Sequence, residues 1–179
     1  MSEPRLLTRA EALSLLAKAG CSQSVINHCR TVSKFAVKLV RAFQKKGYNV
    51  NVQLVEVSGL LHDIGRSRTH SVNHGLVGGE IAHSLELPDS VVQIIERHVG
   101  GGIPKEEARR LGWPARDFLP RTLEEKIVCY ADKRVEGLRT VPMEQALKTY
   151  VRNLGKNHPA IERIQKLHKE IAAIVGDIN

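Results

Sequence analysis

A histidine and an aspartate, His62 and Asp63, follow each other at the end of the apolar segment 52–61. The end of an apolar helix is a buried position, and burying an imidazole beside a carboxylate costs free energy unless a cation compensates. A divalent metal ion is the most economical such cation. If the pair belongs to a metal site, the chain must fold so that other segments supply further ligands on inward-facing positions.

Two more histidines lie on apolar helical faces. With helical spacing, His28 shares a stripe with Val32 and Phe35 and therefore points into the core. His98 ends a second apolar segment and shares a stripe with Ile94. Buried polar groups need partners, and several that point into one core can satisfy one another around a cation.

An aspartate and a fourth histidine complete the candidates. Asp132 lies one helical turn after Val128 and so extends an apolar face. His74 begins a segment whose glycines, Gly75 and Gly78 among them, allow another backbone to approach closely. The sequence thus offers six candidate ligands: His28, His62, Asp63, His74, His98 and Asp132.

Four imidazoles and two carboxylates are enough to hold two divalent ions that share one bridging carboxylate. Nitrogen and oxygen ligands without thiolates favour iron, manganese, zinc, cobalt or nickel over copper(I). The three cysteines, Cys21, Cys29 and Cys129, have no Cys-x-x-Cys spacing and are interpreted as reduced side chains outside the site.

The order His…His-Asp…His…His…Asp over about residues 24–140 resembles the HD superfamily of metal-dependent phosphohydrolases. His28 matches the first histidine of that family, His62-Asp63 its doublet, and Asp132 its closing aspartate. His74, followed by Gly78, and then His98 resemble the two-metal branch of the family.

A narrower resemblance concerns residues 124–133, which are similar to bacterial HD hydrolases of symmetrical dinucleoside tetraphosphates. Those proteins follow Ala-Asp-Lys with a short Glu-Pro-x-Arg pattern. This chain instead continues with residues 134–139, Arg-Val-Glu-Gly-Leu-Arg, which are one residue longer and lack the proline.

The resemblance implies a metal-dependent phosphohydrolase that cleaves a phosphoester or phosphoanhydride of a nucleotide-type substrate with metal-activated hydroxide. One ion is expected at His28, His62, Asp63 and Asp132, and a second at His74 and His98, with Asp63 bridging. The expected catalytic residues are Asp63, Arg66 and Lys133. Arg66 and Lys133 are also expected to bind substrate phosphate.

Alternatives remain open for these residues. Arg66 can equally be an exposed arginine that is favourable at a helix end. Four other histidines, His70, His83, His158 and His168, are expected to bind no metal, although His70 could replace His74 if the loop folds differently. The alternative function is a non-catalytic nucleotide- or RNA-binding module of HD fold with a structural metal.

Helical signals run along the whole chain and predict an all-α fold, which the resemblance specifies as a compact HD-domain bundle with the metal site in a core cleft. Capping boxes at Thr8–Glu11 and Thr122–Glu125 predict two helix starts. No strand is predicted with any weight. The 179 residues are interpreted as one domain, with a core over about 24–140 and C-terminal helices over 142–176 packed on it.

Charge and composition bound the partners. The net charge of +8 suits a nucleotide or another phosphorylated small molecule, and it allows nucleic acid as a less favoured partner because the few aromatic residues make a poor stacking platform. No apolar stretch is long enough for a membrane, and Met1–Arg5 leads into no secretory segment, so a cytoplasmic location is expected. The oligomeric state is left open.

Overall fold

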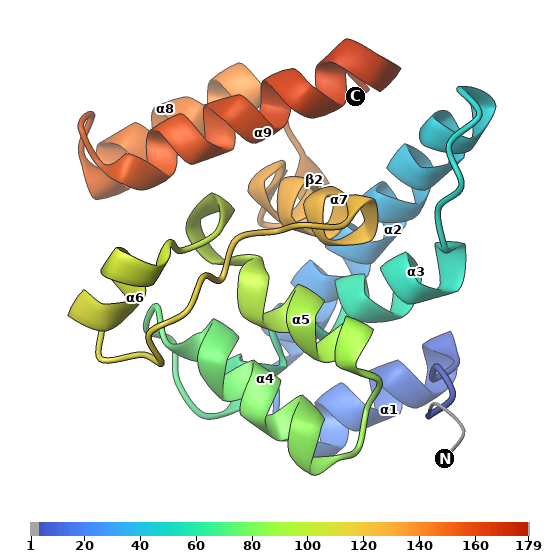
Figure 1. The fold of residues 1–179 in the computed structure, drawn as a ribbon. Coiled ribbons are helices and arrows are strands. Elements are labelled where there is room, and N and C mark those ends of the chain that lie inside the picture. Colours follow the sequence, from blue (N-terminus) through green and yellow to red (C-terminus); the bar gives the residue numbers. More distant parts are fainter. Residues whose placement is uncertain (1–3, 179) are drawn as a thin grey trace.

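The computed structural model describes residues 4–178, and the expected all-α fold is confirmed (Figure 1). Residues 1–3, which begin the N-terminal segment considered above, lie outside the described range. The elements are α1 (Arg9–Lys18), α2 (Gln23–Lys45), α3 (Val52–Leu61), the 3-10 turn η1 (Ile64–Ser67), α4 (His74–Ser84), α5 (Asp89–Arg97), the 3-10 turn η2 (Val99–Gly101), α6 (Lys105–Arg110), α7 (Leu123–Lys133), β1 (Val135–Glu136), β2 (Arg139–Thr140), α8 (Met143–Leu154) and α9 (Pro159–Val175).

The long helix α2 is the central support of the fold. Its start is fixed by Ser22, whose hydroxyl accepts a hydrogen bond from the Val25 amide, and no glycine or proline interrupts it. Helix α3 crosses α2 closely at Gly59, where a Cβ atom would lie 3.0 Å from the Cα of Ser33. This close crossing brings the end of α3 toward the first turns of α2.

Two apolar clusters lie along α2. One joins the middle and end of α2 to α7 and α9 through residues such as Phe35, Leu39 and Val128. The other joins the start of α2 to α1, α3 and α5 through residues such as Leu16 and Leu60. Burial of these side chains provides the main stabilisation of the bundle.

Helices α8 and α9 pack against each other on one side of the molecule (Figure 1). A fully buried arginine, Arg134, ties them to the rest of the fold. Its guanidinium donates to the Tyr130 hydroxyl at 2.7 Å, to the Ile178 carbonyl at 3.1 Å and to the Val141 carbonyl. Because a buried guanidinium needs several acceptors, this residue fixes the path of the chain from α7 into the C-terminal pair.

Two local predictions need correction. The short antiparallel pair β1–β2 was not expected; its strands have two residues each, too few to show alternation, and Gly137 turns between them with a φ of +60°. At Thr122 only half of the capping box forms: the hydroxyl accepts from the Glu125 amide, but the Glu125 carboxylate instead accepts from Arg97 and from the Arg121 amide.

The helix starts predicted at Thr8 and Thr122 and the C-terminal helices predicted over 142–176 are confirmed within a few residues, and the box at Thr8 and Glu11 forms in both directions. Among the helices of residues 4–178, none combines the length and the apolar character that crossing a membrane requires.

Candidate metal centre

Helix ends converge on one point in the core and carry all six candidate ligands. His28 lies in the second turn of α2, His62 and Asp63 directly follow α3, His74 begins α4, His98 directly follows α5, and Asp132 lies in the last turn of α7. Side chains at helix ends can meet without the helices themselves having to interpenetrate. The structure therefore brings together every residue that the sequence analysis placed at the site.

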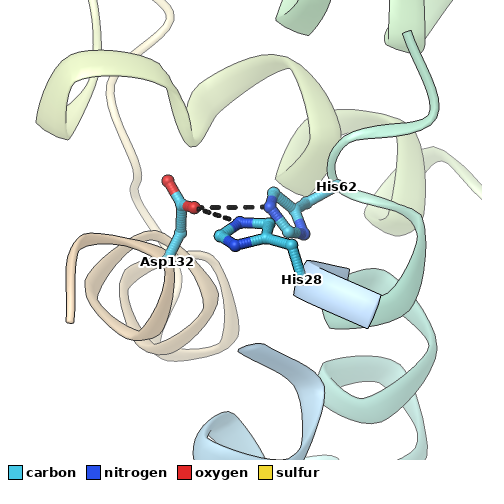
Figure 2. A group of neighbouring side chains, drawn as sticks. All are labelled: His28, His62 and Asp132. Atoms are coloured by element: carbon cyan, nitrogen blue, oxygen red, sulfur yellow. Dashed lines mark hydrogen bonds and ion pairs between the residues drawn. The ribbon is translucent and has the colours of Figure 1, made fainter. Parts of the chain in front are cut away.

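The first group is His28, His62 and Asp132 (Figure 2). The Oδ1 atom of Asp132 lies 3.1 Å from Nε2 of His28 and 3.4 Å from Nε2 of His62. The Oδ2 atom of Asp63 faces the same two imidazoles, at 3.9 and 3.7 Å. Four ligand atoms from three helices thus surround one small volume.

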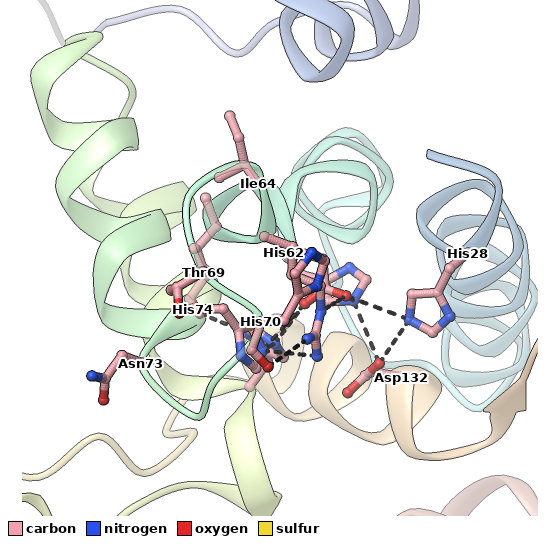
Figure 3. Close-up of polar contacts among 12 residues, drawn as sticks. His28, His62, Ile64, Thr69, His70, Asn73, His74 and Asp132 are labelled. Atoms are coloured by element: carbon pink, nitrogen blue, oxygen red, sulfur yellow. Dashed lines mark hydrogen bonds and ion pairs between the residues drawn. The ribbon is translucent and has the colours of Figure 1, made fainter. Parts of the chain in front are cut away.

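The second group lies on the other side of Asp63. The Oδ1 atom of Asp63 is 3.2 Å from Nε2 of His74 and 3.5 Å from Nε2 of His98. Figure 3 shows His74 on the side of the site away from His28 and Asp132. Each oxygen of this carboxylate therefore faces a different pair of imidazoles. This is the arrangement that a carboxylate bridging two cations requires.

The protonation of three imidazoles follows from their carbonyl partners. Nδ1 of His62, His74 and His98 lies 2.8, 2.7 and 2.7 Å from the backbone carbonyls of Gly59, Ser71 and Ile95. A carbonyl only accepts, so each Nδ1 carries the proton, and in the neutral ring Nε2 presents a lone pair. A backbone carbonyl in this role is typical of metal-binding histidines.

Protein donors satisfy these lone pairs only in part. Nη2 of Arg66 lies 3.4 Å from Nε2 of His74. Nε2 of His74 and Nε2 of His98 also lie only 3.1 Å apart, a repulsive contact between neutral rings unless a proton or metal stands between them. Nε2 of His62 is fully buried and has no hydrogen-bond partner among the described residues. The donor set and these buried, incompletely satisfied lone pairs fit divalent ions.

Burial and neighbouring charge shift the pKa values of the site. Burial, with a contribution from the adjacent His98, lowers the pKa of His74 to about 3, and burial also lowers the pKa of His98, so both rings are neutral as metal ligands must be. Burial opposes charge on His62 and Asp63, but the attraction between them raises the pKa of His62 and holds that of Asp63 well below its ordinary value. Without a metal, a proton on His62 would supply part of the missing positive charge.

A close backbone crossing positions His74. A Cβ atom on Gly65 would lie 2.0 Å from the carbonyl oxygen of His74 and 2.6 Å from the amide nitrogen of Gly78. Only glycine permits η1 and α4 to approach this far. Gly78, one of the small residues predicted to allow close approach near His74, lies in the same contact: a Cβ atom on it would lie 3.2 Å from the Gly65 amide nitrogen.

The two expected substrate-binding cations lie at the edge of the centre. Arg66 donates from Nε to Oδ2 of Asp63 at 2.6 Å, so it contacts a ligand directly. Lys133 is buried and pairs with Asp132; burial opposes its charge, but Asp132 raises its pKa, which keeps the ammonium charged. Both residues line the same cavity as His28, Asp63, His74 and Asp132.

A cavity of about 680 Å³ opens onto the site. Besides His28, Asp63, His74 and Asp132, it is lined by Tyr150, His158 and Arg163 from the C-terminal helices and the turn between them. Sequence reasoning did not assign these three to the site, because no motif distinguishes them from surface residues of an amphipathic helical pair. Only the packing of α8 and α9 beside α7 brings them there.

Four histidines were set aside in the sequence analysis. His83 is exposed on α4, His70 is exposed and offers only its carbonyl to Arg66, and His168 stacks on Tyr130. His158 caps α9, accepting from the Ala160 amide at 3.2 Å, yet it also lines the cavity, which the sequence did not indicate.

Comparison with known proteins agrees with this geometry. The model of the HD domain family matches residues 25–135, the stretch that contains all six side chains. The chain belongs to the HD domain family. HD domains typically bind divalent metals, and the His and Asp clusters described here could hold them.

The chain is also similar in sequence to curated proteins and in fold to solved structures. It is 51% identical over 161 residues to the uncharacterized protein MJ0778 of Methanocaldococcus jannaschii, covering 90% of this chain and 95% of that one. It is 38% identical to a tRNA (cytidine(56)-2'-O)-methyltransferase of Picrophilus torridus, covering 93% of this chain but only 47% of that enzyme. The HD domain of the L. monocytogenes phosphodiesterase PgpH, crystallised with cyclic-di-AMP, shares the fold at a TM-score of 0.54 and 15% identity, over 94% of this chain and 99% of that one.

Proposed function

We propose that this HD domain is a metal-dependent phosphohydrolase with two divalent ions, acting on a phosphoester or phosphoanhydride of a nucleotide-type substrate. The observation that carries the proposal is the position of Asp63, whose two oxygens face two separate pairs of imidazoles. Structural metal sites are usually closed, whereas four of these ligands, His28, Asp63, His74 and Asp132, line an open cavity.

The side chains of the site would have distinct roles in metal binding and substrate binding. His28, His62, Asp63 and Asp132 would hold one ion, and His74, His98 and Asp63 the other. Bound divalent ions activate water and neutralise charge on phosphoryl oxygens. Lys133 would place its ammonium near a non-bridging phosphate oxygen, and Arg66 would do the same on leaving Asp63, where its present contact is one that a bound cation replaces.

The cavity supports a nucleotide-sized substrate. Its volume of about 680 Å³ lies within the range of small-molecule sites. Arg66, Lys133 and Arg163 line it, each paired with a carboxylate of the same lining, and bound metal would release Asp63 and Asp132 from these pairs. Symmetrical dinucleoside tetraphosphates are a specific candidate because of the resemblance at residues 124–133. Cyclic dinucleotides are another, because the structurally similar PgpH domain was crystallised with one.

A second candidate is a non-catalytic module that binds RNA and uses the metal structurally. The similarity to a tRNA methyltransferase favours it, as does the net charge of +8. Since this chain spans less than half of that enzyme, methyl transfer itself is not part of the proposal.

We also propose that residues 1–179 act as one domain, with the pair α8–α9 completing the cavity.

The test is a substrate screen on protein reloaded with manganese, iron, cobalt, nickel or zinc. The panel contains a phosphomonoester, a phosphodiester, a dinucleoside tetraphosphate, a cyclic dinucleotide and a short RNA. Hydrolysis that requires metal and disappears in the Asp63→Ala variant is expected. Protein that holds two ions, binds RNA and cleaves nothing in the panel would favour the second candidate.

A further inference from the structure

A second groove lies on the outer face of α2, beside the β1–β2 hairpin, and it shares no lining residue with the cavity at the metal centre. Its volume is about 880 Å³. The cations along it are Arg9, Arg30, Lys34, Lys38, Arg41 and Arg139. Nothing in the proposed hydrolysis accounts for such a concentration of positive charge away from the ligands.

The cations of α2 form a single row. Arg30, Lys34, Lys38 and Arg41 are separated by four, four and three residues, the spacing that places side chains on one helical face. All four are exposed. From Arg30 to Arg41 the row extends about 17 Å at a rise of about 1.5 Å per residue.

No acidic residue interrupts this row. The whole stretch 12–55 contains neither aspartate nor glutamate, so α2 has no carboxylate of its own. Within residues 4–178, Arg30, Lys34 and Arg41 form no ion pair, while Arg9 pairs with Glu56 at 2.9 Å. Like charges at this spacing repel each other and cost free energy, which an elongated polyanion would recover.

We propose that this groove binds the phosphate backbone of a nucleic acid strand. A row of about 17 Å spans about five base steps at the ~3.4 Å axial rise of a duplex, so it can reach several phosphates of one strand. The apolar lining, with Leu138 62% exposed on the hairpin, offers a surface for sugars without reading bases. The contacts are therefore to the backbone and independent of sequence.

The groove adjoins the cavity at the metal centre. His28 lines the metal cavity, and Thr31, one helical turn further along α2, lines the groove. Across the hairpin, Val135 lines the cavity and Thr140, its partner in the strand register, lines the groove. The inference goes beyond the proposed hydrolysis, since binding in the groove requires no reaction at the ligands.

The test measures binding of labelled 20-nucleotide RNA and DNA of one sequence to the metal-loaded protein by fluorescence anisotropy, over a salt series, with a parallel series in EDTA. The groove variant is Lys34→Glu with Arg41→Glu. The control is Lys18→Glu with Lys169→Glu, which makes the same change of charge at exposed positions outside the groove. Circular dichroism and metal content check that each variant folds.

We expect the groove variant to bind at least tenfold more weakly and to lower the slope of log K against log salt by about 1.5, because two phosphate contacts are lost. The control should change little, binding should persist in EDTA, and hydrolysis of a small phosphodiester should be unaffected by either pair. The RNA and DNA arms identify which nucleic acid is preferred.

Four results would overturn the inference. In the first, neither oligonucleotide binds at low salt. In the second, the control pair weakens binding as much as the groove pair does. In the third, EDTA abolishes binding while the groove variant leaves it intact, and in the fourth, the protein binds polyglutamate in place of the oligonucleotides. The third result places the nucleic acid at the metal centre and the fourth assigns the groove to an acidic protein. Loss of hydrolysis alone would count against the proposed function and not against the groove.

Discussion

At the scale of single residues, Asp63 has the largest predicted effect. Among the six candidate ligands, it is the one whose carboxylate oxygens face both pairs of imidazoles. In Asp63→Ala we expect metal content to fall and metal-dependent hydrolysis to drop to background, measured by elemental analysis and a phosphodiester assay. His83→Ala, on the exposed side of α4, should retain both; a loss of metal in that variant would contradict the assignment of the ligand face.

Arg66 is predicted to act on substrate without holding metal. In Arg66→Ala we expect metal stoichiometry to be unchanged. Arg66 contacts Asp63 but is not itself a candidate ligand, and its removal leaves the Asp63 carboxylate free to bind the ions. The value of kcat/KM should fall about 10- to 100-fold, the worth of a hydrogen bond to a charged group.

Arg68→Ala is the matched control, since Arg68 is an exposed arginine two positions later. Equal losses of activity in both variants would show that Arg66 contributes only to general surface charge. Loss of metal in Arg66→Ala would instead make it part of the ligand scaffold.

At the scale of elements, the contact between η1 and α4 sets the second half of the site. Gly65→Ala should lower the free energy of unfolding by about 3 kcal/mol, because the new Cβ atom meets the backbone of His74 and Gly78, which cannot move aside. Gly137→Ala is the comparison: its φ of +60° is strained for alanine, but no atom is nearby, so a cost of about 1 kcal/mol is expected.

Denaturant unfolding of the two variants measures the difference. Because Gly65 positions His74, its variant should also lose one of the two ions. Equal stability of Gly65→Ala and the wild type would mean that the backbones can separate and that this crossing does not fix the site.

The helices could be predicted from sequence because each carries its own local signals. The apolar stripe of α2, the cap at Thr8 and the punctuating glycines and prolines need no knowledge of the rest of the chain. Residues of the cavity could not be found this way. Tyr150 and Arg163 contribute only because α8 and α9 pack beside α7, and that packing depends on buried contacts of Arg134 that no local pattern indicates.

The six candidate ligands could be predicted because they are polar residues on apolar faces, in an order that resembles one family. Which of these ligand atoms face each other could not be predicted from the sequence. That the two oxygens of Asp63 face different imidazoles, and that Nε2 of His74 and of His98 approach to 3.1 Å, depends on how four helix ends meet.

At the scale of the whole molecule, the proposed ions join helices that are distant in sequence. His28 and Asp132 are 104 residues apart, yet their side chains meet. Binding to the folded state alone at a concentration one hundred times Kd contributes about 2.7 kcal/mol. Treatment with EDTA should therefore lower the melting temperature by roughly 5–10 °C at about 2–4 °C per kcal/mol.

Differential scanning calorimetry before and after EDTA, followed by readdition of manganese or zinc, checks this stabilisation. The melting temperature should return with the metal in the wild type and stay low in Asp63→Ala. An EDTA effect of the same size in Asp63→Ala would indicate that the stabilising ions bind elsewhere.

The most direct measurement is anomalous diffraction from crystals grown with manganese. Two anomalous peaks are predicted. One should lie between His28, His62, Asp63 and Asp132, and the other between His74, His98 and Asp63, each within about 2.0–2.3 Å of its ligand atoms. Crystals in which the six side chains keep their positions and no peak appears among them would contradict the metal centre and the hydrolysis proposed from it.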